Sequence, residues 1–363
     1  MHPLAMRLPE PEVVPDGQQP TPHESRPLPA TRQQIYDRLW SCVVERLKVD
    51  LIPSAVMRKN TSGWAWDARV LESGNHYDPV YTRLLAHLEQ KGEISPERSI
   101  LVETTTGSAG ASFARIAAEL GYQALVFVPR DLPGARIGAI QREIRKMEGS
   151  EVRFSEPGKY VGGLVRELGR FLVTTRETGF LGKDVYAVDH SRRPEAVDAI
   201  EEVGGLILDM LPEDVTIGCA TLALGNGTSF TGLGRALRRR FPECRLVGVE
   251  PQEAAWFYYK KHGEAEYRRH FHTAPGHRSH GLLGTGGWGV EFPNMDLDML
   301  DQIYPVAANE WKYTLREMRH HGCDVGHSTA ACIAAANSQF DMRGEPPSVY
   351  FTVYYDSIFR YDD

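Results

Sequence analysis

Short apolar runs alternate with segments of helical periodicity along most of the chain. The apolar runs predict buried strands at 99–103, 124–128, 151–154, 185–188, 245–250, 303–306 and 348–354, and one more directly before Gly225. The periodic segments predict helices at 111–120, 137–147, 194–210, 231–240, 309–320 and 328–338. Because strands that alternate with helices form parallel sheets covered on both faces, the pattern predicts an α/β fold with mainly parallel sheets.

The N-terminal part follows a different pattern. Residues 1–31 are rich in proline and poor in aromatic residues, which predicts a disordered or extended lead-in. Apolar residues then recur at helical spacing from Ile35 to Leu47, after a predicted capping box at Thr31 and Gln34. This helix is a candidate surface for a homodimer.

Two α/β domains are expected, and their bounds are predictions. A helix and a strand that join the C-terminal domain come first, then an N-terminal α/β domain and a C-terminal α/β domain, at 32–61, 62–189 and 190–363. Residues 256–287 are rich in aromatic residues and histidine and interrupt the alternation.

Two turns that contain glycine follow two predicted strands. The residues Gly225, Asn226, Gly227, Thr228 and Ser229 lead from a strand into a helix, where backbone N–H groups and the helix dipole favour a phosphate. The other turn, 104–110, also ends a strand, so the two turns predict a ligand cleft between the domains. An ordinary strand-to-helix connection remains the alternative for each turn alone.

Charge and composition exclude several classes of protein. A net charge of -7 argues against nucleic acid as the main partner, and the basic run 238–240 is expected to be a solvated helix face. No apolar stretch is long enough to cross a bilayer and no signal pattern is present, so a cytoplasmic location without membrane contact is expected.

Cysteine and histidine do not predict a metal site. The five cysteines are scattered and form no CxxC pair, which favours reduced thiols. Four histidines fall within residues 270–280, but neither carboxylates nor cysteines complete a recognisable ligand spacing. We therefore predict loop histidines without a metal, of which His280 is the candidate for the active site.

The order of the motifs resembles fold type II pyridoxal-phosphate enzymes, the tryptophan synthase β-subunit-like superfamily, and within it the cysteine synthase and cystathionine β-synthase group. The segment 103–110, ETTTGSAG, resembles the family's substrate loop, and 225–235, GNGTSFTGLGR, resembles its phosphate loop. Further similar segments follow in the family's order at 247–251, 289–298 and 326–331. Each motif alone is weak, whereas five in order imply the fold.

The resemblance implies pyridoxal phosphate, a small amino-acid substrate and a homodimer. It implies that Ser108 takes the place of an asparagine that contacts the cofactor, and that Ser328 or Thr329 meets the pyridine nitrogen. The substrate carboxylate would be bound by the backbone amides of four residues of the first turn, Thr105, Thr106, Gly107 and Ala109.

One segment departs from the family. The stretch 75–83, NHYDPVYTR, corresponds to the segment with the Schiff-base lysine, and it places Tyr81 at the lysine position. A phenol cannot form an imine, and Lys59 and Lys183 are the candidates among the other lysines to replace it. Tyr81 is either a general acid or base with a lowered pKa or a filler of the lysine's space.

Three functions remain open at this point. The first is a cysteine synthase-like enzyme that acts by β-elimination or β-replacement and binds the cofactor non-covalently or already joined to an amino acid. The second is a retired or repurposed homologue that binds a phosphorylated small molecule or a protein partner without pyridoxal imine chemistry. The third is an enzyme of new chemistry on the same scaffold.

Overall fold

The computed structural model describes residues 28–59, 61–156, 160–341 and 349–361. The lead-in predicted for 1–31 therefore lies almost entirely outside the described residues. The chain divides into two compact units. Unit 1 comprises residues 1–45, 77–196 and 289–291, and unit 2 comprises 46–76, 197–288 and 292–363.

Unit 1 contains a four-stranded parallel sheet in the order β5-β4-β3-β6. Its strands are β3 (Ser99–Thr104), β4 (Gln123–Pro129), β5 (Glu151–Ser155) and β6 (Asp184–Ala187). Its helices are α1 (Ala30–Glu45), α2 (Asp78–Gln90), α3 (Ala109–Glu119), α4 (Gly134–Ile144) and α5 (Tyr160–Thr175).

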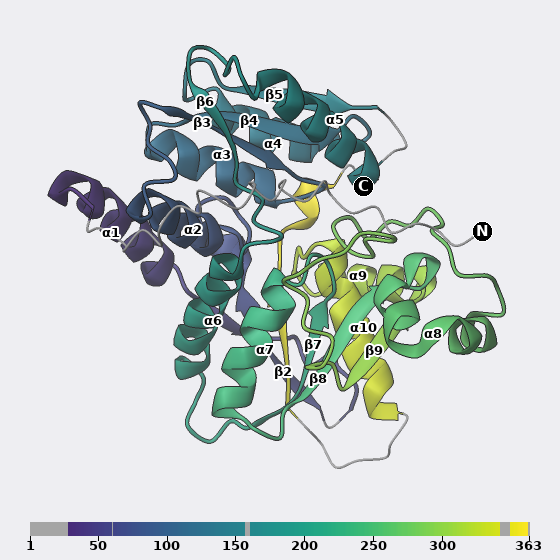
Figure 1. Ribbon diagram of the computed structural model, residues 1–363. Coiled ribbons are helices and arrows are strands. Elements are labelled where there is room, and N and C mark those ends of the chain that lie inside the picture. The colour runs from purple at the N-terminus through teal and green to yellow at the C-terminus, as the bar shows by residue number, and fades with distance from the viewer. Residues whose placement is uncertain (1–27, 60, 157–159, 342–348, 362–363) are drawn as a thin grey trace. The chain divides into compact units, whose positions relative to one another are not determined.

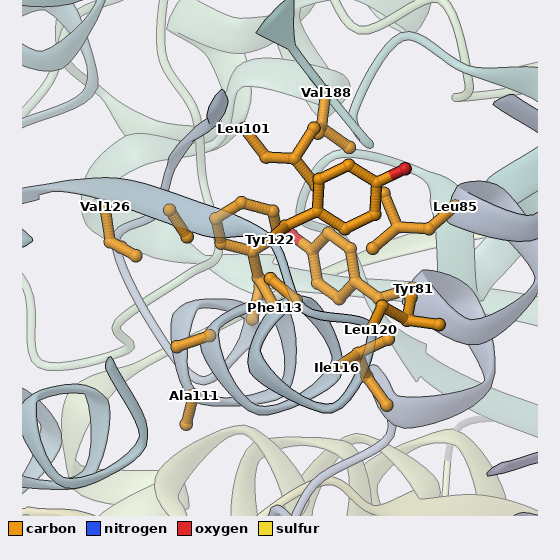
Figure 2. Packing of buried hydrophobic residues seen from close by; sticks show 14 of the residues in the cluster. Tyr81, Leu85, Leu101, Ala111, Phe113, Ile116, Leu120, Tyr122, Val126 and Val188 are labelled. Atoms are coloured by element: carbon orange, nitrogen blue, oxygen red, sulfur yellow. The ribbon is translucent and has the colours of Figure 1, made fainter. Parts of the chain in front are cut away.

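The core of unit 1 lies on both faces of this sheet. Side chains of a strand alternate between the faces, so Leu101 of β3 packs with α2, α3 and α4, whereas Ile100 and Val102 pack with α5. Figure 1 shows α3 and α4 on one side of the strands and α5 on the other. Figure 2 shows the larger cluster, in which the rings of Tyr81 and Phe113 lie 5.3 Å apart between their centroids.

Unit 2 contains a six-stranded sheet in the order β1-β2-β10-β7-β8-β9. Its strands are β1 (Val49–Leu51), β2 (Ser62–Asp67), β7 (Ile217–Ala223), β8 (Arg245–Pro251), β9 (Gln302–Val306) and β10 (Val349–Tyr354). All pairs are parallel except β1 with β2. Its helices are α6 (Pro194–Asp209), α7 (Thr228–Arg240), α8 (Trp256–Phe271), α9 (Ala308–His320) and α10 (His327–Asp341), with 3-10 turns η1 (Ala68–Val70), η2 (Gln252–Ala254) and η3 (Ile358–Arg360).

The predicted α/β fold with mainly parallel sheets is confirmed, but the prediction for the N-terminal helix was wrong. Helix α1 packs on the core of unit 1 through Tyr36 and Leu39, and only the strand that follows it joins unit 2. The helix already includes Thr31, and the Pro29 carbonyl accepts the amides of Arg32 and Gln33, so Thr31 does not form the predicted capping box.

Two further segments can be compared with their predictions. Most of 256–271 is helical, as α8, and Gly263 interrupts the helix with φ 80°. The basic run on α7 is paired with acidic side chains, as expected for a solvated face: Arg238 with Asp301, Arg239 with Glu201 and Arg240 with Asp209.

Two features of other protein classes are absent from the described residues. Among the described helices, none combines the length and the apolar character needed to cross a membrane. Within residues 28–59, 61–156, 160–341 and 349–361, histidine, cysteine and carboxylate side chains do not gather into a group that could hold a metal ion.

Candidate functional site

The loop 225–229 joins β7 to α7 in unit 2 and presents unused hydrogen-bond donors. Gly227 is the N-cap residue of α7 at φ 90°, a left-handed conformation that glycine adopts easily. The amide of Thr228 donates to Asn226 Oδ1 over 3.1 Å. Within the part of the chain that the structure describes, the amides of Ser229 and Phe230 and the Ser229 hydroxyl donate to no other group. These donors at a helix N-terminus favour an anion.

A second segment of unit 2 supports this loop. The Asn294 amide group donates to Thr228 Oγ1 over 3.0 Å, and the Thr231 hydroxyl donates to the Asn294 carbonyl over 2.7 Å. Thr228 is fully buried, so its hydroxyl supports the loop and does not face a ligand. Of the two hydroxyls predicted as ligand donors, that of Ser229 is the one that can bind a ligand. A side chain at Gly225 would lie 2.5 Å from the Gly284 carbonyl oxygen, which explains the glycine there.

The start of α10 separates the two candidates for the pyridine nitrogen. The Thr329 hydroxyl donates to the Val353 carbonyl over 3.0 Å and accepts the Tyr355 amide over 3.1 Å, and this residue is fully buried. The hydroxyl of Ser328 has no hydrogen-bond partner among the described residues. Ser328 is therefore the candidate that can contact a ligand, whereas Thr329 ties α10 to β10.

The loop between β3 and α3 in unit 1 uses two of the four predicted donors internally. The Thr105 amide donates to the Phe127 carbonyl over 3.0 Å, and the Gly107 amide donates to Thr105 Oγ1 over 3.0 Å. The amides of Thr106 and Ala109 have no partner within the described residues, so they are the ones that can bind a carboxylate. The predicted roles of the Thr105 and Gly107 amides in substrate binding are thus corrected.

Two other residues define the same loop. Ser108 is the N-cap residue of α3, but its side chain makes no capping hydrogen bond. The buried side chain of Arg136 lies against the loop, and a side chain at Gly107 would be 2.8 Å from its Nη1 atom. Arg136 was missed from the sequence because nothing in its helix distinguishes it from a surface arginine.

Tyr81 lies in a buried hydrogen-bonded cluster of unit 1. Its hydroxyl is 2.9 Å from His190 Nδ1 and 3.2 Å from Glu103 Oε2, and the latter two atoms are 3.0 Å apart. The three residues Tyr81, His190 and Glu103 are 0%, 5% and 2% exposed, respectively. Glu103 and His190 were not identified as site residues from the sequence. Glu103 lies near the end of β3, and His190 follows the neighbouring strand β6. Polar side chains at the ends of neighbouring parallel strands meet at one edge of the sheet.

The protonation state of Tyr81 argues against a role as a base. Burial raises the pKa of the Tyr81 phenol well above its ordinary value of 10, and the charge of Glu103 adds to this shift. The phenol therefore stays protonated at neutral pH, contrary to the interpretation that requires a lowered pKa.

The lysines of the described ranges do not offer a replacement. Lys59 is exposed, and Lys183 Nζ donates to the Pro96 carbonyl over 2.7 Å. Each lysine that the structure describes is exposed or half-buried, as expected for lysines at the protein surface.

His280 lies in unit 2, partly buried beside His277, with the two ring centroids 5.6 Å apart. Its Nδ1 atom is buried and has no partner in the described ranges. Burial, and secondarily the charge of His277, lowers the pKa of His280 to about 4. The ring is therefore neutral at pH 7 and can accept a proton only at a large cost, which limits it as a general acid.

The lowered pKa of His280 predicts a pH dependence of stability. Between pH 6.5 and about 4 the unfolded chain binds a proton at this residue that the folded chain does not, so acidification favours unfolding. We expect His280→Gln to reduce this loss by on the order of 2 kcal/mol, measured by denaturant titration from pH 7 downward. The exposed His272, replaced by asparagine, is the control, and an equal effect of both variants would contradict the assignment.

The chain is similar in sequence to known proteins over most of its length. A family model described as "Pyridoxal-phosphate dependent enzyme" matches residues 70–352. A probable cysteine synthase of Bacillus subtilis is 26% identical over 298 residues, 80% of this chain and 84% of the relative. Cysteine synthase 3 of Caenorhabditis elegans is 25% identical over 293 residues, 78% and 77% of the two chains.

Solved structures share the fold. The O-acetylserine-dependent cystathionine β-synthase of Helicobacter pylori superposes with a TM-score of 0.71 at 20% identity, covering 90% of this chain and 96% of its own. Because the family model spans most of the sequence, including both loops, the chain belongs to the family of pyridoxal-phosphate dependent enzymes.

Proposed function

We propose that this chain is a cysteine synthase-like enzyme that acts on a small α-amino acid by β-elimination or β-replacement and holds pyridoxal phosphate without a lysine bond. The observation that carries the proposal is the set of unused donors at 225–229. Two amides and the Ser229 hydroxyl stand at the N-terminus of a 13-residue helix. This donor set matches the phosphate of the cofactor without a charged side chain.

The residues fit two parts of the cofactor. The loop 225–229 suits its phosphate, and the Ser328 hydroxyl suits its pyridine nitrogen, because Ser328 is buried to 8% exposure and has no partner in the described chain. When bound, pyridoxal phosphate supplies an electron-withdrawing ring that acidifies the Cα–H bond of an amino acid. The residues that the structure describes do not fit covalent attachment, since Tyr81 offers a neutral phenol and the described lysines lie at the surface.

The chain's other contribution is to hold the amino acid. The Thr106 and Ala109 amides are unused in the described chain, and the buried guanidinium of Arg136 lies against the same loop. This combination of N–H donors and a nearby cation favours a carboxylate. We infer that the loop orients the substrate through its carboxylate, as the resemblance implies.

The buried state of Tyr81 favours a second candidate function. A phenol that remains protonated and donates into its own cluster cannot take over the base role of a lysine. A repurposed homologue that retains a phosphate site and lacks imine chemistry would show this arrangement. The two functions differ in whether an amino acid changes the spectrum of the protein with bound cofactor.

The test is a titration of the purified full-length protein with pyridoxal phosphate, followed by its absorbance, with and without L-serine. We expect saturable binding without a pyridoxyl-lysine peptide after borohydride reduction, and a spectral change on addition of L-serine. Replacing Ser229 or Ser328 by alanine should each weaken binding about tenfold, the effect of losing one hydrogen bond. The matched control is Thr174→Ala on α5, whose hydroxyl is used by the Arg170 carbonyl.

Three outcomes would count against the proposal. Absence of binding at any concentration would overturn the cofactor assignment. A trapped pyridoxyl-lysine would show that a lysine serves after all. Binding without any response to O-acetyl-L-serine or L-serine would favour the repurposed homologue.

A further inference from the structure

We propose that Tyr81, Glu103 and His190 form a positioning cluster that holds the loop 104–110 in the conformation that receives the substrate carboxylate. The inference rests on the proposed function for its ligand, but its geometry is independent of any cofactor. All three side chains belong to unit 1, and they come from α2, from β3 and from the segment directly after β6.

Hydrogen bonds to Glu103 define the cluster. Its Oε2 atom accepts the Tyr81 hydroxyl over 3.2 Å, the His190 amide over 3.2 Å and the His190 ring over 3.0 Å. Its Oε1 atom accepts the Thr104 amide over 2.8 Å. A carboxylate accepts and does not donate, so the network assigns a proton to His190 Nδ1 and makes Tyr81 a donor.

The Thr104 amide connects this carboxylate to the loop. Glu103 precedes Thr104 directly, so the bond to Oε1 fixes the backbone where β3 ends and the loop begins. The next amide, of Thr105, is fixed by the Phe127 carbonyl of β4, and the Thr105 hydroxyl then accepts the Gly107 amide. Restraint therefore passes from the buried carboxylate to the centre of the loop in three successive hydrogen bonds.

The cluster holds the side chains of Tyr81, Glu103 and His190 in a single arrangement. Buried donors and acceptors that lose their partners cost free energy, so each of the three side chains keeps the other two in place. Phe113 packs against the Tyr81 ring at 5.3 Å, and Tyr77 packs edge-on against His190 at 5.3 Å. A loop held by this cluster loses less entropy when it binds an anion than a loop that is free to move.

The test compares two buried tyrosines of one core. Tyr81 and Tyr122 both belong to the cluster in Figure 2, and the Tyr122 hydroxyl donates to Glu89 Oε1 over 2.7 Å. Tyr81→Phe and Tyr122→Phe each remove one hydroxyl that donates to a buried glutamate. We expect similar losses of stability, and faster amide hydrogen exchange in the peptide 104–110 for Tyr81→Phe only.

A second readout uses the protein loaded with pyridoxal phosphate. The concentration of L-serine that gives half the spectral change should rise about tenfold in Tyr81→Phe and stay constant in Tyr122→Phe. Equal exchange of 104–110 in both variants, or equal L-serine response, would overturn the proposal. If the wild-type protein does not respond to L-serine, the proposed function fails, whereas the exchange experiment still decides on the cluster.

Variants of His190 keep the test decisive if Tyr81→Phe does not fold. Asparagine can place an amide nitrogen where Nδ1 of the histidine lies, so His190→Asn should retain the slow exchange of 104–110. Leucine offers no donor, so His190→Leu should lose it. A result in which both variants exchange equally would contradict a positioning role of the hydrogen bond to Glu103.

Discussion

Replacing Glu103 by alanine is expected to lower the free energy of unfolding by about 3–5 kcal/mol. The carboxylate is 2% exposed and accepts four donors, two of which are the backbone amides of Thr104 and His190. The Tyr81 hydroxyl and the His190 ring can still bond to each other over 2.9 Å, but the two amides lose their partner inside the protein. Urea titration of both proteins measures the difference.

The control for this substitution is Glu119→Ala in the same unit. Glu119 pairs with Arg38 at the surface, where both side chains are well exposed, so its loss should cost less than about 1 kcal/mol. If Glu103→Ala lowers the free energy of unfolding as little as Glu119→Ala, water replaces the carboxylate as the partner of the two amides. The cluster would then not stabilise the fold.

Replacing Gly227 by alanine is expected to cost about 3–5 kcal/mol and to abolish binding of pyridoxal phosphate. The residue has φ 90°, and an added Cβ would press on the backbone of Met295 and the carbonyl carbon of Asn294. Backbone atoms cannot rotate away as a flexible side chain can. The loop must therefore move, and the amides at the start of α7 move with it.

Gly322→Ala separates the two causes of this effect. Gly322 also has a left-handed conformation, φ 75°, but an added Cβ would meet nothing within 4 Å. Its cost should be about 1–2 kcal/mol, the conformational share alone. If thermal unfolding shows equal costs for the two variants, the contact with the segment 294–295 does not restrain the loop.

The fold was predictable because its signals are local. Strands such as β3 and β8 each contain a short apolar run, and the helices between them carry the 3.6-residue period. The helix α1 shows where such signals stop. Its apolar spacing predicts a helix correctly, but which core it joins depends on Tyr36 and Leu39 meeting residues far along the chain.

The site was predictable in part for the same reason. The turn at 225–229 has a local signature, namely glycines between a strand and a helix. The choice between Ser328 and Thr329 required the structure, because it depends on hydrogen bonds to Val353 of β10 and to Tyr355 directly after it, both more than twenty positions away. Likewise, Glu103 gains its meaning only from the packing of Tyr81 and His190 around it.

The cluster around Glu103 also bears on the speed at which unit 1 loses its structure. It joins positions that are 22, 87 and 109 residues apart, and it closes only when β6 has paired with β3. Because closing such long loops costs entropy, we expect these contacts to form late in folding. Weakening them should therefore leave the folding rate nearly unchanged and increase the unfolding rate, so the cluster determines the lifetime of the folded unit.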